Sequence, residues 1–324
     1  MMSATTNSER NATIPVVDRI HGEEAGTARP LGFIGLGAMG LPMAVSAARH
    51  HALLACDTDP VRIALLIEEV GQLSTVHTTP VPAEVGARCD VVVLMLPTSA
   101  QVGPVVRELA ETLRPGGLVI DMGSSNPAET RRLAAELADR GIRLMDAPVS
   151  GSVVKALDGT LSILAGGAEA DIERAMPYLR AMGERIIRTG PVGSAHAMKT
   201  LNNFVYAAGL LAASEALQMA EAAGLDLSIL TDVLNASSGR NVATETKVRQ
   251  FILPGSYEGG FRLGLMAKDL ETAAAFAEET GIDAASLRTC LAVWRRALDT
   301  LGPEADNTEI HRFLGPTPEP PSLP

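Results

Sequence analysis

The chain has 324 residues, 46% of them hydrophobic, and carries a formal net charge of −11 at pH 7. This length predicts about two domains of roughly 150 residues each. The acidic balance argues against a nucleic-acid or anionic-membrane partner, because neither would find a basic surface. No apolar run approaches the roughly 18 residues of a membrane helix. The longest such run, residues 207–217, is interrupted by Ser214 and Glu215.

The cysteines and the chain ends indicate the cellular setting. Cys56, Cys89 and Cys290 are far apart and odd in number, which is typical of neither a disulfide framework nor a metal site. We therefore expect no metal and a reducing, cytoplasmic compartment. Residues 1–29 are polar and acidic and resemble neither a secretory signal nor a transit peptide. We expect a disordered extension there and a flexible tail over residues 316–324.

A glycine-rich turn follows the first predicted strand. Residues 31–34 form a short apolar strand, and residues 35–40 follow the pattern G-x-G-x-x-G. A helix over residues 41–49 and a strand over residues 52–56 supply the context in which this pattern indicates dinucleotide binding rather than an ordinary tight turn. The three glycines then serve the turn, the approach of the pyrophosphate and the packing of helix against strand. The predicted cofactor contacts are Gly35, Leu36, Gly37, Ala38, Met39 and Gly40.

Asp57 ends the second strand, near the usual spacing of about 20 residues for a carboxylate that binds the adenosine ribose. A carboxylate at this place repels a 2′-phosphate, so the sequence predicts NAD in preference to NADP. Arg62 lies close enough in sequence to soften that preference, but it is expected on the exposed face of the next helix.

Polar loops follow several further strands. The carboxyl ends of the strands in a doubly wound sheet line the ligand cleft, so these repeated polar loops favour a shared site over plain turns. The further strands are expected at residues 90–97, 117–121, 143–146, 161–165 and 186–188.

From Ser194 the apolar spacing changes to 3.6 residues, which predicts one long helix to about Ala223, stopped by Gly224. The predicted fold is an α/β Rossmann domain over residues 30–191, with a doubly wound, mostly parallel sheet. An all-α domain for substrate and oligomerisation follows over residues 192–315, joined through the long helix. Its further helices are expected at residues 227–234, 241–253, 261–280, 284–299 and 311–314.

Lys199 stands in a run of mostly small or apolar residues at the junction of the two halves, and Asn203 projects from the same helix face. Burial lowers the pKa of a lysine towards the range useful to a general base. The alternative is a lysine that snorkels from a partly covered helix. His196, one turn earlier, is a second candidate base, although we expect it to pack or cap.

A second lysine, Lys268, lies beside Asp269 in the apolar stretch 265–270. From composition it is interpreted as a surface charge. Asp269 is expected on another face of the helix, because adjacent helical residues do not face each other. The Ser-Ser-Gly-Arg sequence at residues 237–240 is predicted as a small-residue turn between helices.

Taken together, these segments resemble the β-hydroxyacid dehydrogenase family over residues 31–314. The resemblance implies a Rossmann domain and an all-α domain joined by a long helix, with homodimers or homotetramers formed through the helical half. It also implies NAD-dependent oxidation of a 3-hydroxy acid, such as 3-hydroxyisobutyrate, to its semialdehyde, or the reverse reduction. The matching segments are residues 32–40, 95–99, 146–151, 190–203, 237–240 and 265–270.

The resemblance also assigns roles to residues. Lys199 matches the catalytic lysine that handles the proton of the reacting hydroxyl, and Asn203 matches the asparagine that orients this group. Ser150 and Gly151 match the loop that holds the substrate carboxylate. The remaining matches are Ser124 at the substrate or nicotinamide, Leu96 and Pro97 along the nicotinamide, and Lys268 at the cofactor.

Two departures from the family pattern bear on the substrate. Ser152 follows Ser150-Gly151 where the family has a second glycine, and Met122-Gly123-Ser124 replaces the usual Ser-Ser-Thr. Both changes lie where the substrate is expected, so they favour a larger or more polar acid of the tartronate-semialdehyde, glycerate, threonate or sulfolactate type. An imine reductase, which shares this plan but typically lacks the lysine, and a non-catalytic NAD-binding module are the alternatives.

Overall fold

The computed structural model describes residues 29–71 and 75–315. The extension expected over residues 1–29 lies outside this part of the chain except for Arg29, and the tail expected over residues 316–324 lies outside it entirely. Arg29 belongs to the folded chain. Its guanidinium donates a hydrogen bond to Asp90 Oδ1 at 2.7 Å and a second one to the carbonyl of Ala87.

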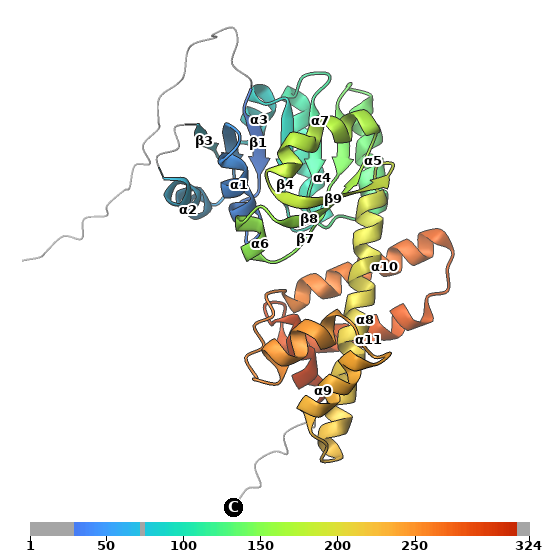
Figure 1. The fold of residues 1–324 in the computed structure, drawn as a ribbon. Helices are drawn as coiled ribbons and strands as arrows, with labels where there is room; N and C mark the ends of the chain where they lie inside the picture. Colours follow the sequence, from blue (N-terminus) through green and yellow to red (C-terminus); the bar gives the residue numbers. More distant parts are fainter. Residues whose placement is uncertain (1–28, 72–74, 316–324) are drawn as a thin grey trace, which may run out of the picture.

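The first half of the described chain is built on one nine-stranded sheet with the order β3-β2-β1-β4-β5-β6-β8-β7, and β9 pairs with β8 (Figure 1). The pairs from β3 to β6 are all parallel, whereas β8 runs antiparallel to β6 and β7. This is the doubly wound, mostly parallel arrangement predicted from the sequence. The strands are β1 (Leu31–Ile34), β2 (Leu53–Cys56), β3 (Val76–Thr79), β4 (Val91–Leu94), β5 (Leu118–Asp121), β6 (Arg143–Asp146), β7 (Val149–Ser150), β8 (Leu161–Gly166) and β9 (Gly183–Gly190).

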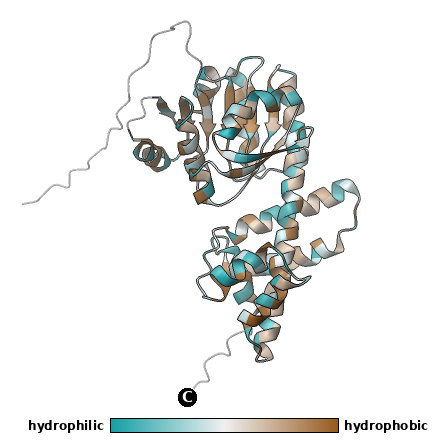
Figure 2. Ribbon diagram, viewed as in Figure 1, coloured by the Kyte–Doolittle hydropathy of each residue, from teal (hydrophilic) through white to brown (hydrophobic). Residues whose placement is uncertain are grey.

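Helices cover both faces of this sheet, so its central strands are buried on both sides. Phe33 and Val93 contribute to one apolar cluster, whereas Ile34 and Leu94 contribute to the other, because successive residues of a strand point to opposite faces. The apolar strands lie inside the layer of more polar helices (Figure 2). These helices are α1 (Gly40–Ala48), α2 (Pro60–Val70), α3 (Pro82–Arg88), α4 (Ser99–Thr112), α5 (Pro127–Ala138), α6 (Val153–Leu157) and α7 (Glu169–Arg180).

The second half is helical and has its own core around the fully buried Trp294. The expected long helix is present and ends before Gly224, whose φ of 72° stops it. One segment differs from expectation, because residues 243–252 form a π-helix and not an α-helix. The elements are α8 (Ser194–Ala222), α9 (Leu227–Ala236), the π-helix η1 (Ala243–Ile252), α10 (Leu263–Thr280), α11 (Ala285–Leu301), the 3₁₀ turn η2 (Asn307–Glu309) and α12 (Ile310–Leu314).

Helix α8 joins the two halves (Figure 1). It contacts β8 and β9 in the Rossmann half and α10 and α12 in the helical half. The first turns of α8 therefore lie where the two halves meet, and this is the part of the helix that carries Lys199 and Asn203.

Candidate active site

The glycine-rich turn between β1 and α1 has room for a phosphate group. A Cβ on Gly37 would meet no atom within 4 Å, whereas a Cβ on Gly40 would lie 1.9 Å from the carbonyl oxygen of Gly35. Gly35 has a φ of 98° and makes the turn. Helix α1 begins with no side-chain cap. The N–H of Leu41 donates to the carbonyl of Gly37 at 3.0 Å and Pro42 has no N–H, so an anion at this helix end would be bound by the N–H groups of the turn that precedes α1. These residues fit the pyrophosphate of a dinucleotide.

Asp57 lies at the carboxyl end of β2 and is partly exposed. Its Oδ2 accepts a hydrogen bond from the N–H of Leu36 at 2.7 Å, and its Oδ1 accepts one from the N–H of Asp59 at 2.9 Å. The carboxylate therefore supports the glycine-rich turn and also stands at the edge of the predicted cofactor site, beside α2.

Leu96 and Pro97 follow β4, next to the turns that follow β1 and β5. A Cβ on Gly35 would lie 3.0 Å from a methyl group of Leu96, and a Cβ on Gly123 would lie 2.7 Å from the carbonyl oxygen of Leu96. The carboxyl ends of three neighbouring strands thus converge around Leu96, while Pro97 is exposed. This edge is where a doubly wound sheet binds its ligand.

Lys199 lies on the second turn of α8 and is half-buried. Burial lowers the pKa of its ammonium group, because the charged form loses hydration. The carboxylate of Asp269 acts in the opposite direction and the nearby Lys268 adds to the lowering. A lysine in these surroundings can lose and regain a proton at a substrate oxygen.

Asn203, one turn further along α8, is buried and donates a hydrogen bond from Nδ2 to Asp269 Oδ2 at 2.5 Å. The other oxygen of Asp269 accepts a hydrogen bond from Ser124 Oγ at 2.8 Å. The Asp269 carboxylate on α10 therefore binds a side chain from the loop after β5 and a side chain from α8.

Two sequence-based interpretations of this region were wrong. Lys268 is not a plain surface charge, since its Nζ donates to the carbonyl of Ser124 at 2.6 Å and pairs with Asp269 Oδ1 at 2.8 Å. Asp269 is not merely a neighbour of Lys268 in sequence, because its carboxylate forms this ion pair with the Lys268 ammonium. Asp269 is the site residue that sequence reasoning missed. Its place in the matching segment 265–270 was the only available signal.

The predicted carboxylate loop follows β7. Ser150 pairs with Ser162 of β8, and Ser150, Gly151 and Ser152 are all exposed. Gly151 has a φ of 149°, and Ser152 caps α6 by accepting a hydrogen bond from the N–H of Lys155. Within the described ranges, no hydrogen bond joins this loop to Lys199 or Asn203.

His196 does not lie open to a substrate. Its ring is buried and its Nδ1 shares a hydrogen bond with Thr130 Oγ1 at 2.8 Å. The turn at residues 237–240 is exposed, between α9 and η1.

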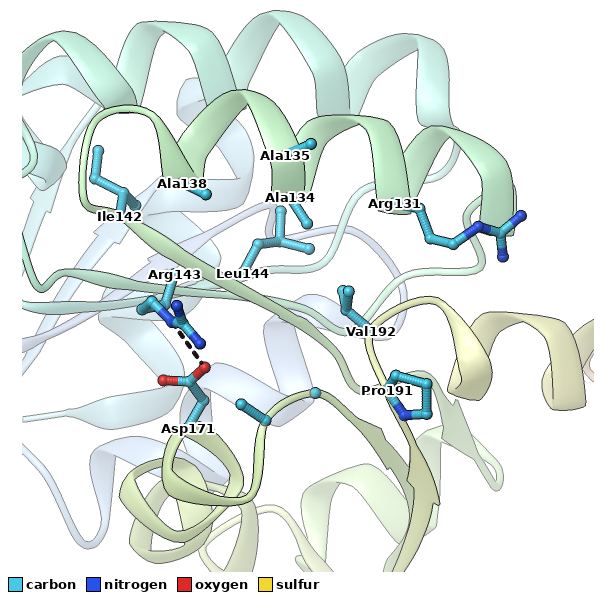
Figure 3. Close-up of a pocket in the computed structure, with 12 residues that line it drawn as sticks. Arg131, Ala134, Ala135, Ala138, Ile142, Arg143, Leu144, Asp171, Pro191 and Val192 are labelled. Carbon is cyan, nitrogen blue, oxygen red and sulfur yellow. Dashed lines mark hydrogen bonds and ion pairs between the residues drawn. The ribbon is translucent and has the colours of Figure 1, made fainter.

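A pocket of about 470 Å³ lies elsewhere on the Rossmann half, between α5 and the segments before α7 and α8 (Figure 3). Its wall combines apolar residues such as Ala134 and Leu144 with the ion pair of Arg143 and Asp171, 3.0 Å apart. Neither Lys199 nor the glycine-rich turn lines it.

Residues 29–71 and 75–315 contain no group of three or more histidine, cysteine or acidic side chains arranged to hold a metal ion. None of their helices combines the length and the apolar character needed to span a bilayer. All three cysteines are buried and free.

Comparison with known proteins decides the family. Residues 30–190 match the family model of the NAD binding domain of 6-phosphogluconate dehydrogenase. Residues 193–314 match the model described as the NAD-binding part of NADP-dependent 3-hydroxyisobutyrate dehydrogenase. A 2-(hydroxymethyl)glutarate dehydrogenase of Eubacterium barkeri is 33% identical over 74% of this chain and 79% of its own. The chain belongs to the β-hydroxyacid dehydrogenase family.

This β-hydroxyacid dehydrogenase also aligns with two further relatives over almost the whole length of each relative. An NAD-dependent L-serine dehydrogenase of Pseudomonas aeruginosa is 32% identical over 89% of this chain and 99% of its own. A 3-hydroxyisobutyrate dehydrogenase of Mycobacterium tuberculosis, solved with L-serine, is 29% identical with a TM-score of 0.82, over 89% of this chain and 99% of its own. The enzyme is thus an oxidoreductase of the NAD-dependent 3-hydroxyacid dehydrogenase type.

Proposed function

We propose that this dehydrogenase oxidises the primary hydroxyl of a small β-hydroxy acid to a semialdehyde, or catalyses the reverse reduction, with Lys199 as general base and acid. The observation that carries the proposal is the position of Lys199. It is half-buried on the helix between the two halves, its pKa is lowered by burial, and it lies one turn from Asn203.

Oxidation removes a proton from the hydroxyl oxygen and a hydride from its carbon. When bound, NAD supplies the hydride acceptor. The neutral amine of Lys199 takes the hydroxyl proton, and in reduction its ammonium form returns that proton and polarises the carbonyl. Asn203 orients the reacting oxygen, and Asp269 holds the amide of Asn203 in place.

We assign the other predicted site residues to binding. Ser150, Gly151 and Ser152 receive the substrate carboxylate, and Ser124 contacts the substrate or the nicotinamide end of the cofactor. Lys268 reaches the cofactor from the helical half. The glycine-rich turn of residues 35–40, together with Leu96 and Pro97, binds the rest of the dinucleotide. The open space above Gly37 supports the pyrophosphate position.

NAD is the proposed cofactor in preference to NADP, because the carboxylate of Asp57 at the cofactor edge repels a 2′-phosphate. The functional halves are proposed as residues 30–191 for the cofactor and 192–315 for substrate and oligomerisation.

The substrate class follows from chemistry that the relatives' names share. The compounds 3-hydroxyisobutyrate, L-serine and 2-(hydroxymethyl)glutarate each carry a primary hydroxyl on the carbon β to a carboxylate. They differ in the third group, which is a methyl, an amino group or a second carboxylate chain. Ser152 puts a hydroxyl into the carboxylate loop, so the polar members of this series are the favoured substrates.

We also propose a homodimer or homotetramer formed through the helical half. Several large apolar side chains are more than half exposed there, and contact with a second subunit would remove them from water. Sedimentation velocity at micromolar concentration tests this, and a monomer would contradict it. The side chains are Val205, Met219, Ile229, Val233 and Val242.

The experiment that tests the function is NAD reduction, followed by absorbance, with 3-hydroxyisobutyrate, L-serine, 2-(hydroxymethyl)glutarate, 3-hydroxypropionate, glycerate, threonate and a sulfolactate. We expect at least one acid to be oxidised, and Lys199→Ala to lose about 10³-fold in turnover while retaining NAD binding. An unchanged turnover number in the Lys199→Ala variant would contradict the assignment of Lys199 as the general base. If the wild-type enzyme binds NAD but reduces it with none of the acids, an imine reductase or a non-catalytic module is favoured.

A further inference from the structure

Asp146 is fully buried at the carboxyl end of β6, and its carboxylate faces the start of α8. Its Oδ1 accepts a hydrogen bond from the N–H of Gly193 at 2.7 Å, and its Oδ2 accepts one from the N–H of His196 at 2.8 Å. The first N–H groups of a helix have no partner within the helix. Gly193, at the N-cap position with a φ of 88°, has no side chain to serve them. A carboxylate 47 residues earlier in the chain therefore caps α8.

The two segments joined by this contact carry the residues that are proposed to bind the two functional groups of the substrate, the carboxylate and the hydroxyl. Along the chain, Asp146 is followed by β7, which ends at Ser150, and then by Gly151, and Ser150 and Gly151 are proposed to receive the carboxylate. Along α8, His196 is followed one turn later by Lys199, which is proposed to take the hydroxyl proton. A single buried side chain thus joins the segment that holds the carboxylate to the helix that carries the base.

A neighbouring carboxylate braces the same region. Asp121 is the register partner of Asp146 on β5. Its Oδ1 accepts a hydrogen bond from the N–H of Gly123 at 3.0 Å and its Oδ2 accepts one from Ser125 Oγ at 2.7 Å, which shapes the loop that carries Ser124. The loop after β5 is therefore also held from inside the sheet.

The buried ring of His196 lies between these two carboxylates. Its Nε2 is 3.9 Å from Asp121 Oδ2 and its Nδ1 is 3.9 Å from Asp146 Oδ2. Burial raises the pKa of Asp146, and His196 and the two N–H donors act in the opposite direction. A buried cluster held by charge-assisted hydrogen bonds leaves little freedom for the first turn of α8 to shift.

We propose that Asp146 is a positioning residue for the reaction. By capping α8 from the strand that leads to Ser150 and Gly151, it sets the distance between the site of the substrate carboxylate and Lys199. This distance selects acids whose hydroxyl lies on the β carbon. The inference rests on the function proposed above, since it concerns the same substrate and the same base.

The test compares Asp146→Asn with the wild-type enzyme and with a matched control, Asp171→Asn. Asp171 is a buried carboxylate that pairs with Arg143, at the opposite end of β6. An asparagine at position 146 accepts one N–H but presents its own NH₂ group to the other. We measure NAD affinity and the number of NAD-binding sites by calorimetry, and kcat per NAD-binding site with the preferred acid of the panel.

We expect Asp146→Asn to bind NAD as the wild type does and to lose about 10²-fold in kcat per site, because a misplacement of about 1 Å has this effect. The control is expected to keep both values. A merely structural role would lower the number of competent sites and leave the rate per site unchanged, which would overturn the proposal. If Asp146→Asn does not fold, Asp146→Glu serves instead, with an expected loss of about 10-fold per site, and a wild-type rate per site would overturn the proposal. A wild-type enzyme inactive with every acid would instead reject the function on which the proposal rests.

Discussion

The hydroxyl of Ser124 donates a hydrogen bond to Asp269 Oδ1 at 2.8 Å and so joins the two halves of the molecule at the proposed site. The residues are 145 positions apart in the sequence. The same carboxylate holds the amide of Asn203 and the ammonium of Lys268. Asp269 is thus the common partner of residues from the loop after β5, from α8 and from α10, although it was not among the site residues predicted from the sequence.

The first prediction concerns Asp269→Asn. This change removes the charge that offsets Lys268 and leaves fewer acceptors for Ser124 and Asn203. We expect a loss of about 2 kcal/mol in the free energy of unfolding, which is typical of hydrogen bonds to a charged group, and a fall in kcat of about 10²-fold. Urea denaturation and initial rates measure the two effects. Asp283→Asn, which removes an exposed carboxylate paired with Arg288, is the control and should change neither value.

The second prediction is the pH dependence of the reaction. Oxidation needs the neutral form of Lys199, so its kcat/KM should rise with pH through the pKa of Lys199. Because burial lowers that pKa, the midpoint of the rise should lie below the ordinary lysine value of 10.5. Reduction needs the ammonium form and should fall over the same range. Rate profiles from pH 6 to 11 in both directions test this, and an oxidation rate independent of pH would contradict the role of Lys199 as the base.

The third prediction separates two glycines of the cofactor turn. Gly37→Ala places its methyl group in open space, so we expect an unchanged melting temperature but a loss of at least about 10-fold in NAD affinity, since the methyl obstructs the pyrophosphate. Gly40→Ala places its methyl group against the carbonyl of Gly35 and should cost about 1–3 kcal/mol of stability. Calorimetry of NAD binding and thermal unfolding distinguish these outcomes. A wild-type NAD affinity in the Gly37→Ala variant would mean that the pyrophosphate does not bind against Gly37.

The fourth prediction concerns cofactor choice. Asp57→Asn keeps an acceptor oxygen for the N–H of Leu36 but removes the charge. Without the repulsion of a 2′-phosphate, the ratio of kcat/KM for NADP to that for NAD should increase by about 10²-fold. Steady-state kinetics with both cofactors measure this ratio. A wild-type enzyme that already prefers NADP would contradict the assignment of Asp57.

Strands whose residues are buried on both faces were predicted correctly from the sequence, because their apolar composition reflects that burial. Strands β1 and β4 are apolar throughout, and β5 is apolar up to its final residue Asp121, because helices cover both faces of the sheet. Each of the three strands was predicted within a few residues. Strand β3 was missed, because residues 76–79 at the edge of the sheet are only partly buried and carry polar side chains. The π-helical form of η1 was not predicted, since its apolar spacing does not distinguish it from an α-helix.

The sequence predicted the Rossmann and helical halves, the glycine-rich turn after β1 and the lysine on the joining helix, because each depends on residues within one or two elements. Which side chains meet follows from the tertiary structure alone. Asp269 pairs with Asn203 and Ser124 from 66 and 145 residues away, and Asp146 caps α8 through the N–H of Gly193, 47 residues later. Contacts of this kind arise from the packing of distant elements, and no local pattern in the chain records them.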